Sequence, residues 1–469
     1  MKIKMILPAL TEAKSQYWRP IKYSLFPPLG LATLAAYCDE NDEVMITDEH
    51  VEEIDLNDAP ELVVIQVYIT NAFRAYKLAN HYKSKGSYVC LGGLHVTSLP
   101  QEAMLHADTI FLGPGEECWP RFLKDFKNKS AAKLYFSAER TLVNIPPVRR
   151  DLIKRQLYLV PNSIVVTRGC PHHCDFCYKD AFFENGKSFY TQQVDDALSE
   201  IERLPGKHLY FLDDHLLGNK NFASSLFQGM KGMNRVFQGA STIDAILRGN
   251  LIEEAVEAGL RSIFIGFETL NNDNLIQSNK KQNLGKDYAA AIQKLHSLGV
   301  MINGSFVFGL DDDNKDTFKR TVDWAVKNGL TTSTFHILTP YPGTRLYKQM
   351  IAENRILHCN WNLYDTRNVV YKTKNISAEE LKQGYNYAYN SFYSWNNILK
   401  SSLQHQQLKH IIKHFAYAGG WKKFEPLWNF IIKTKALNKM LPLLENILST
   451  AKKYPKQKIN NYSPFPAIA

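Results

Sequence analysis

The chain has 469 residues, of which 45% are hydrophobic and 22% are charged. This composition excludes a disordered polypeptide, and no run of about 18 consecutive apolar residues suggests a membrane-spanning helix. The formal net charge is +10, and residues 391–469 carry all of it with 12 Lys, no Arg and 2 Glu. A basic tail on a neutral body argues against nucleic acid as a partner of the whole protein.

Residues 1–130 are predicted to form a doubly wound parallel sheet. Short apolar runs alternate with stretches of helical period, which is the pattern of strand–helix–strand units. The expected strands are KIKMILPAL, EVMITDEH, LVVIQVY, YVCLGGLH and TIFLGP, and the expected helices are GLATLAAYCDEN and NAFRAYKLANHYKSKG. Thr11, Glu12 and Lys14 interrupt the apolar start of the chain, so we interpret it as a first strand and not as a signal peptide.

Two glycine-rich turns follow strands of this predicted sheet. Gly92 and Gly93 follow the fourth strand, and Gly113 follows the fifth. Ligands of doubly wound sheets bind beyond the carboxyl ends of the strands, where glycine allows a ligand to approach the backbone closely. These three glycines are therefore candidate ligand-binding residues, although ordinary strand-to-helix turns use glycine as well.

A second alternation of strands and helices begins near residue 161, after a segment predicted as a linker over 131–160. Six strand-like runs separated by helical segments predict a partial β/α barrel of TIM type over 161–376, with its active site at the carboxyl ends of the strands. The runs are SIVVTRGC, HLYFLDDH, RVFQGAST, SIFIGFE, MINGSFVFGL and TTSTFHILTP. Residues 377–469 have a helical, lysine-rich pattern and are expected to form a C-terminal extension.

Three of the seven cysteines lie within eight residues, in TRGCPHHCDFCY directly after the first barrel strand. Cys170, Cys174 and Cys177 have the spacing C-x3-C-x2-C, whereas the other four are scattered singly. An odd total of seven cysteines in a chain this long favours a reducing cytoplasm over a disulfide framework. Three thiolates can hold a 4Fe–4S cluster and leave one iron open to a substrate. A redox thiol group, or a zinc ion completed by His172 or His173, is the alternative.

With the aromatic Phe176 before the last cysteine, this motif resembles the signature of radical S-adenosylmethionine (SAM) enzymes. The resemblance implies a 4Fe–4S cluster whose open iron chelates SAM, and reductive cleavage of SAM to a 5′-deoxyadenosyl radical. It also implies that Phe176 lies near the adenine. Further SAM contacts are implied at the ends of later strands: Asp213 and Asp214 in YFLDDH, Ser241 and Asp244 in GASTIDA, and Glu268 in IGFE.

Residues 1–125 resemble the cobalamin-binding domain that precedes the barrel in one branch of that family, through FPPLGLATLAAY, TDEHVEEID and GGLHVTSLPQEAMLHADTIFLGPGEECWP. The resemblance implies cobalamin near the three glycines named above. The D-x-H-x-x-G motif, which supplies a lower cobalt ligand in other cobalamin proteins, is incomplete, because Asp48 and His50 are not followed by its glycine. We therefore expect cobalamin without a histidine ligand, and we expect His95 to be a loop residue with partners of its own.

The same resemblance implies a cobalamin-dependent methyltransferase that acts on an unactivated carbon of a small-molecule or lipid-like substrate, with flavodoxin or ferredoxin as electron donor. The alternatives are a cobalamin-linked cyclase or oxidoreductase, a tRNA methylthiotransferase, and a non-catalytic cobalamin or redox sensor. The methylthiotransferase needs a further set of cysteines in its N-terminal domain, whereas Cys38, Cys90 and Cys118 are widely spaced. The intact cysteine motif argues against a sensor.

The tail from about Trp395 combines its excess of lysine with the aromatic residues Trp421, Phe424, Trp428 and Phe430. Basic amphipathic segments of this kind bind anionic lipid surfaces. A helical cap that packs on the barrel and turns its lysines to water is the alternative. The sequence thus leaves open whether this cytoplasmic protein also contacts a membrane.

Overall fold

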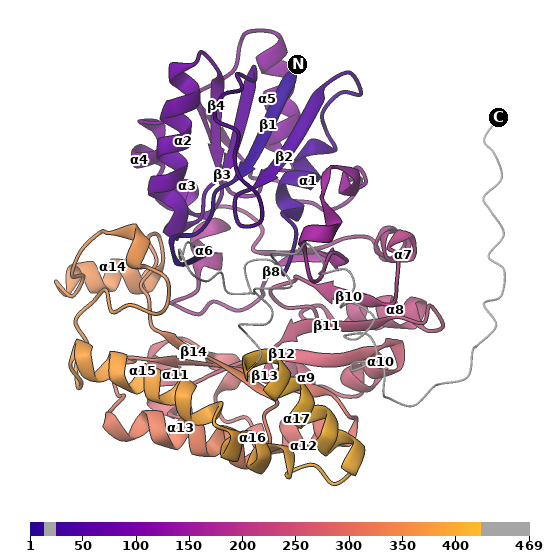
Figure 1. Ribbon diagram of the computed structural model, residues 1–469, viewed down its shortest axis with the longest axis vertical. Helices are drawn as coiled ribbons and strands as arrows, with labels where there is room; N and C mark the ends of the chain where they lie inside the picture. Colours follow the sequence, from indigo (N-terminus) through magenta and orange to yellow (C-terminus); the bar gives the residue numbers. More distant parts are fainter. Residues whose placement is uncertain (14–24, 424–469) are drawn as a thin grey trace.

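A computed structural model describes residues 1–13 and 25–423, and in Figure 1 the N-terminal sheet lies above the barrel. The N-terminal sheet is parallel throughout and has the strand order β2-β1-β3-β4-β5-β6. The five predicted strands are confirmed, and β6 extends the sheet into the segment predicted as a linker. The strands are β1 Lys2–Leu7, β2 Glu43–Asp48, β3 Leu62–Gln66, β4 Tyr88–Gly92, β5 Thr109–Leu112 and β6 Leu134–Phe136.

Helices cover both faces of this sheet, because its central strands are apolar on both sides. The helices are α1 Leu29–Ala35, α2 Ala72–Ser84, α3 Leu94–Ser98, α4 Pro100–Met104 and α5 Cys118–Lys127, with the 3-10 turns η1 Thr11–Ala13 and η3 Ile69–Asn71. In β3, Val63 and Ile65 belong to the buried cluster formed with α2, whereas Leu62 and Val64 belong to the cluster formed with α1 and α5. This alternation follows from the two-residue period of a strand.

The second sheet is a partial barrel of six parallel strands in the order β14-β13-β12-β11-β10-β7. All six lie where the sequence predicted strands. They are β7 Ser163–Ile164, β10 His208–Phe211, β11 Val236–Ser241, β12 Leu260–Glu268, β13 Met301–Phe308 and β14 Thr332–Ile337. A separate antiparallel pair consists of β8 Thr167–Gly169 and β9 Phe189–Thr191.

Helices and turns join the barrel strands and surround them. The 3-10 turns η4 Arg150–Leu152 and η5 Arg155–Leu157 precede the barrel. The helices are α6 Tyr178–Phe182, α7 Val194–Arg203, α8 Lys220–Met230, α9 Ile243–Ile246, α10 Leu251–Ala258, α11 Asn272–Gln277, α12 Tyr288–Ser297, α13 Lys315–Lys327 and α14 Arg345–Ala352, with the turns η6 Lys281–Asn283 and η7 Trp361–Leu363. The domain limits at residues 130, 160 and 376 remain predictions.

The first barrel strand is shorter than predicted. β7 ends at Ile164, and the chain then leaves the barrel to form β8. The carboxylate of Asp213, which follows β10, accepts hydrogen bonds from the backbone N–H groups of Val166 (3.1 Å) and Thr167. Asp213 thereby provides the hydrogen-bond acceptor that a neighbouring strand would otherwise provide for these two N–H groups. The departure from the barrel brings the cysteines, which lie between β8 and α6, to the carboxyl end of the barrel.

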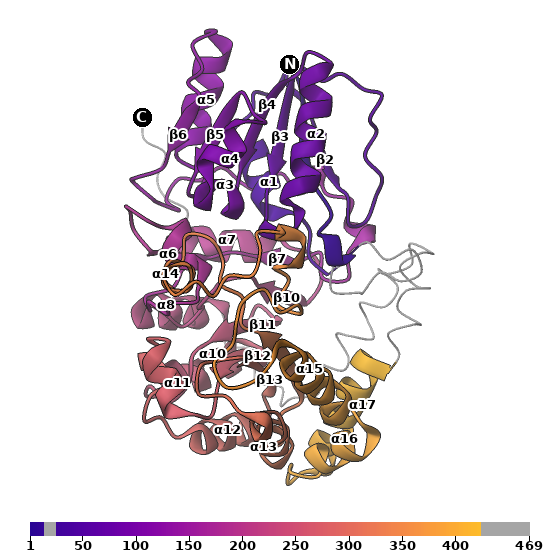
Figure 2. The same ribbon diagram turned by 90° about the vertical axis from the view of Figure 1, so that its left-hand side faces the viewer.

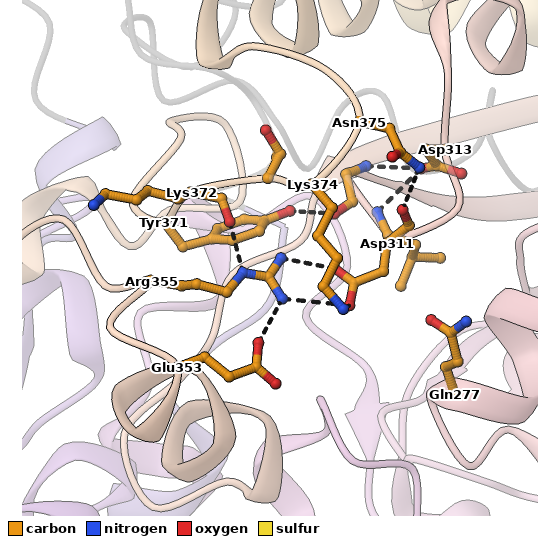
Figure 3. A network of polar contacts seen from close by, with 12 residues as sticks. Gln277, Asp311, Asp313, Glu353, Arg355, Tyr371, Lys372, Lys374 and Asn375 are labelled. Atoms are coloured by element: carbon orange, nitrogen blue, oxygen red, sulfur yellow. Dashed lines mark hydrogen bonds and ion pairs between the residues drawn. The ribbon is translucent and has the colours of Figure 1, made fainter.

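A polar network fixes the loop after β13 to the segment between α14 and the C-terminal extension (Figure 3). Arg355 donates to Asp311 (2.7 Å) and to Glu353 (3.0 Å), and Lys374 brings a second positive charge to Asp311 (2.7 Å). Asp313 accepts from the backbone N–H groups of Gly309 and Leu310, which follow β13 directly. The network holds this segment against the end of the strand.

The same segment also ties the barrel to the N-terminal domain. Trp361 in η7 donates its indole N–H to Glu102 in α4 (3.1 Å). Glu102 also accepts from the hydroxyl of Tyr76 (2.9 Å) and lies 2.9 Å from Nε2 of His95. The carboxylate of Glu102 thus contacts Tyr76 and His95 of the N-terminal domain and Trp361 of the segment that follows the barrel. The two domains are therefore joined by a polar contact.

The C-terminal extension consists of α15 Ala378–Phe392, α16 Trp395–Ser402 and α17 Leu408–Lys423. Tyr417 of α17 packs against Val236 and Met301, at the amino-terminal ends of β11 and β13. Both views place α16 and α17 at the end of the molecule opposite the N-terminal sheet (Figures 1 and 2). Within the described residues 1–13 and 25–423, no helix is long and apolar enough to cross a membrane. The side chain of Trp421 and residues Phe424, Trp428 and Phe430 lie outside what the structure describes.

Candidate functional site

The three clustered cysteines lie in a short loop that its own backbone and one lysine hold in place. The backbone N–H of Cys170 donates to Ser188 (3.2 Å), and that of Cys177 donates to the carbonyl of Cys174 (3.0 Å). Lys179 donates its ammonium to the carbonyl of Cys170 (3.0 Å). The loop is therefore shaped before any ligand binds to it.

Cys174 is buried, Cys170 and Cys177 are partly buried, and the three thiols are close enough to affect one another. Burial raises the pKa of Cys170 to about 11 and that of Cys177 to about 12, and repulsion from neighbouring thiolates adds to both shifts. Burial also raises the pKa of Cys174, whose Sγ accepts a hydrogen bond from Gln282 (3.3 Å). Bound iron would supply the positive charge that keeps such thiols deprotonated.

The donor set fits a polynuclear iron–sulfur cluster better than a single ion. Among the residues that the structure describes, no three His, Cys, Asp or Glu side chains are arranged to hold one metal ion. A 4Fe–4S cluster has no such requirement, because each thiolate binds a different iron. His173 contacts Asp180 (3.1 Å), whereas Nε2 of His172 lies 3.9 Å from Asp244 and has no hydrogen-bond partner among the described residues.

Lys280 links the end of β12 to the cysteine loop. Its ammonium lies 2.6 Å from Oε1 of Glu268 and 6.0 Å from the centre of the Phe176 ring. Burial lowers the pKa of Lys280, but Glu268 and the thiolate of Cys174 outweigh it and raise the pKa above its ordinary value. Glu268 has a left-handed backbone with φ of +64°, a conformation that non-glycine residues adopt at a cost. A charged pair and a strained backbone thus meet beside the loop.

The adjacent residues Asp213 and Asp214 have different surroundings. Asp213 is 3% exposed and holds the backbone before the cysteine loop, and its second oxygen is buried without a hydrogen-bond partner in the described part of the chain. Burial raises the pKa of Asp213 to about 7, although the N–H groups of Thr167 and Val166 oppose the shift. Asp214 is exposed to the space between the domains and accepts from the hydroxyl of Tyr178 (2.7 Å).

Ser241 and Asp244 lie at the end of β11 and the start of α9. Ser241 is 5% exposed, and Asp244 accepts from the hydroxyl of Thr242 and from Arg248 (2.7 Å). Burial would raise the pKa of Asp244, but the Thr242 hydroxyl, His172 and Arg248 lower it below its usual value. Asp244 is therefore an ionised group near His172, which belongs to the cysteine loop.

The candidate glycines of the N-terminal sheet line a small, largely apolar slot of about 130 Å³ at the carboxyl edge of that sheet. Gly92, Gly93 and Gly113 share the slot with Leu31, Leu34, Val64, Ile65, Phe111 and Trp119. At Gly93, with φ of +115°, a Cβ would lie 2.8 Å from the carbonyl oxygen of Val67. The fold itself thus requires this glycine, whether or not a ligand occupies the slot.

His50 and His95 make internal contacts. Nδ1 of His50 lies 2.7 Å from Asp48, and Nε2 accepts from the backbone N–H of Leu10 (3.1 Å). His95 is the second residue of α3, so the expectation that it lies in a loop is wrong. It is fully buried, contacts Glu102 and meets the ring of Trp361 edge-on with 5.5 Å between centroids. Both nitrogens of His50 are engaged, and His95 points into the contact between the domains, so neither is presented at the slot.

A larger cavity of about 420 Å³ lies between the two domains. The N-terminal domain contributes Gly30, Gln66, Tyr68 and Glu116 among others, and the barrel contributes Thr167, Arg168, Tyr178 and Asp214 among others. The slot and this cavity are adjacent, because Gly30, Gln66, Glu116 and Arg168 line both. The cavity therefore extends from the residue after Cys177 to the glycine-rich edge of the N-terminal sheet.

Arg168 and Glu116 form an ion pair in the wall that the two cavities share. Their side chains meet at 2.5 Å and are 30% and 11% exposed. Arg168 precedes Cys170 by two residues, and Glu116 belongs to the GPGEE turn. Both residues lie in motifs given above, but the sequence predicted no role for either of them. It also predicted no role for Tyr178 or Lys280. The position of Tyr178 beside a cluster cysteine was the one available signal.

The matching family model is "Radical SAM superfamily", over residues 164–325. The bacteriochlorophyllide d C-12(1)-methyltransferase of Chlorobaculum tepidum is 29% identical over 388 residues, covering 80% of this chain and 84% of that protein. The hopanoid C-2 methylase of Rhodopseudomonas palustris is 22% identical over 360 residues, covering 71% of this chain and 66% of that protein.

Among solved structures, the cobalamin-dependent SAM radical enzyme OxsB with aqua-cobalamin bound has the same fold with a TM-score of 0.66. The match is 15% identical and covers 95% of this chain and 75% of that chain. The cysteine spacing, the barrel and the family match agree with one another, and a 4Fe–4S cluster and SAM are the cofactors that this domain implies. Residues 164–325 of this enzyme therefore form a radical SAM domain.

Proposed function

We propose that this protein is a cobalamin-dependent radical SAM methyltransferase that methylates an unactivated carbon of a small-molecule or lipid-like substrate. One observation carries the proposal: the cavity between the domains runs from Tyr178, beside the cysteine loop, to the edge of the apolar slot. When bound, the cluster and SAM supply hydrogen abstraction, and cobalamin supplies the transferable methyl group. A substrate in this cavity would face both sites at once, which is what transfer without diffusion of an intermediate requires.

The residues of the cavity have separate tasks in this proposal. Asp214, with Tyr178 as hydrogen-bond donor, orients a polar group of SAM next to the cysteine loop. The Arg168–Glu116 pair holds the two walls at a fixed separation. Arg150, Gln192 and Glu200 add polar groups to the lining. Apolar side chains line much of the remainder and would exclude water from reactive intermediates: Leu7, Phe26, Leu142, Ile145, Val148, Val165 and Leu212.

SAM contacts are proposed at the strand ends that the sequence indicated. Phe176 offers an aromatic face for the adenine, and Glu268 and Asp214 offer carboxylates near the loop. Ser241 and Asp244 offer a hydroxyl and an ionised carboxylate at the end of β11. We assign Asp213 to positioning the loop, because one of its oxygens already accepts two backbone N–H groups.

Cobalamin is proposed to bind with its nucleotide tail in the slot near Gly92, Gly93 and Gly113, and without a histidine ligand from this chain. The slot is narrow and apolar, as an aromatic base requires, and it opens toward the cavity. His50 has both nitrogens engaged. Replacement of His50 or His95 by Ala should therefore leave the visible spectrum of bound cobalamin unchanged.

The substrate is proposed to carry a large apolar part. By their names, the two relatives act on a bacteriochlorophyllide and on a hopanoid. The apolar side chains of the cavity are consistent with such a molecule. Electrons would come from a flavodoxin or a ferredoxin, since the cluster must be reduced by an external donor.

Comparison of metabolites between a deletion strain and its parent tests the function. The proposal expects one compound to lose the mass of a methyl group in the deletion strain and to regain it when the gene is restored. Restoration with a Cys170→Ala, Cys174→Ala, Cys177→Ala variant should fail. A compound changed instead by ring closure or by oxidation would favour the cyclase or oxidoreductase alternative.

A further inference from the structure

The surface of α16 and α17 carries a continuous apolar face that the described chain leaves uncovered. On α16, Trp395, Leu399 and Leu403 are 49%, 47% and 57% exposed, and on α17, Leu408, Ile412 and Phe415 are 69%, 59% and 38% exposed. The spacing is i, i+4, i+8 on one helix and i, i+4, i+7 on the other, so each set forms one stripe along its helix.

The two stripes lie side by side. α16 and α17 pack together, and the rings of Trp395 and Phe415 stack at 5.7 Å. The turn between the helices joins Leu403 to Leu408, so the chain reverses direction and the remaining pair, Leu399 and Ile412, falls between these two ends. Six large apolar side chains therefore form one face, whereas exposed apolar residues on monomeric proteins are usually scattered.

The charges around this face are of one sign. From Trp395 to Lys423 the chain has five Lys and no Asp or Glu. Lys400 and Lys409 follow Leu399 and Leu408 directly, which places each about 100° around its helix from the stripe. A lysine in this position can lay its methylene chain along an apolar surface and extend its ammonium to the level of lipid phosphates.

We propose that the α16–α17 face docks on the surface of a bilayer that contains anionic lipid. An apolar stripe flanked by lysine matches such a surface in both respects, because apolar side chains enter the acyl boundary while lysines meet the negative headgroups. A second copy of this chain matches less well, because two such faces would bring lysines together.

The face lies at the end of the molecule opposite the cavity between the domains (Figures 1 and 2). Docking would therefore hold the enzyme at a membrane, and would not by itself deliver substrate into the cavity.

Sedimentation of the full chain with vesicles tests the proposal. Binding is expected to vesicles of phosphatidylcholine with phosphatidylglycerol at low salt, with weaker binding at high salt and to phosphatidylcholine alone. Leu399→Glu with Ile412→Glu should lower the partition coefficient more than about tenfold, since each change removes an apolar contact and adds a repelled charge. Lys400→Gln with Lys409→Gln should lower it by roughly fivefold per lysine.

Leu105→Glu is the matched control, because Leu105 is 78% exposed on the N-terminal domain and lies far from α16 and α17. It should bind vesicles as the parent protein does, and circular dichroism should show that all variants are folded. The proposal is overturned by an absence of binding at low salt, or by equal loss of binding in the Leu105 variant. It is also overturned if the α16–α17 variants abolish a dimer in analytical ultracentrifugation while vesicle binding is absent, because the face would then be a contact between copies.

Discussion

The ion pair between Arg168 and Glu116, 2.5 Å apart, joins the strand that leads into the cysteine loop to the glycine-rich turn of the N-terminal sheet. The pair spans two domains that each resemble a separate cofactor-binding unit. It also lies in the wall shared by the slot and the larger cavity. We infer that it fixes the separation of the two sites.

Arg168→Ala is expected to destabilise the protein by about 1 to 3 kcal/mol, because it leaves a largely buried carboxylate without its cation. The double variant Arg168→Ala, Glu116→Gln should recover part of that loss. Chemical denaturation of Arg168→Ala, Glu116→Gln and the double variant, beside the parent protein, provides a double-mutant cycle. Additive effects would mean that the two side chains do not stabilise each other.

Asp213 and Asp214 provide a matched pair of neighbours with opposite expectations. Asp213→Ala leaves two backbone N–H groups without an acceptor, and we expect a loss of about 2 to 4 kcal/mol in the free energy of unfolding, together with a lower iron content after reconstitution. Asp214→Ala should change stability by less than about 0.5 kcal/mol, because its carboxylate faces the cavity. Equal destabilisation by both changes would contradict the assigned roles.

Removal of the three thiols should abolish the iron–sulfur cluster. The triple variant Cys170→Ala, Cys174→Ala, Cys177→Ala is expected to lose both the visible absorption of the cluster and the release of 5′-deoxyadenosine. The reason is that no other described group can replace three thiolates. Cys359→Ala is the control, because that cysteine is exposed and lies apart from the loop. A full complement of iron in the triple variant would disprove the ligand assignment.

The slot at the N-terminal sheet can be filled without disturbing the backbone. Gly30 lies in α1, lines both cavities, and a Cβ at this position would meet only Gln66, at 3.7 Å. We expect Gly30→Leu to fold and to lose cobalamin on gel filtration, whereas Gly30→Ala should retain it. Retention by both variants would show that cobalamin binds elsewhere.

The free energy of unfolding should fall at acid pH because of a group of histidines between the barrel and the C-terminal extension. His296, His405, His410 and His414 lie together, with 2.9 Å between Nε2 of His405 and Nδ1 of His414. Burial, together with the neighbouring histidines and Lys413, lowers the pKa of His405 from 6.5 to about 4, and burial lowers the pKa of His414 as well. In the described part of the chain, the charged groups near this cluster are Lys409, Lys413 and Arg261, so no described carboxylate offsets protonation.

The unfolded chain therefore binds more protons than the folded one between pH 6.5 and 4, so stability decreases as pH falls through this range. His405→Gln should flatten the pH dependence of the melting temperature there. A curve for this variant that is parallel to that of the parent protein would assign the acid sensitivity to other groups.

The barrel and the cysteine loop were predictable because their signals are local. The runs that became β10 to β14 are apolar and bounded by turns, and the three cysteines are close in sequence. The early end of β7 was not predictable, because it depends on the carboxylate of Asp213, 46 residues after Thr167. The contact of Trp361 with Glu102 spans 259 residues and has no periodic signature. Side-chain pairs that form only when distant segments meet are invisible to pattern and propensity.

The measurement that tests the central claim most directly is the yield of two products from SAM. The anaerobic protein, loaded with cluster and hydroxocobalamin and supplied with a low-potential reductant, is expected to release both 5′-deoxyadenosine and S-adenosylhomocysteine. The first should require the three cysteines alone, and the second should also require cobalamin. Release of 5′-deoxyadenosine with no S-adenosylhomocysteine from the cobalamin-loaded protein would contradict a cobalamin-dependent methyltransferase, and release of neither would contradict radical SAM activity altogether.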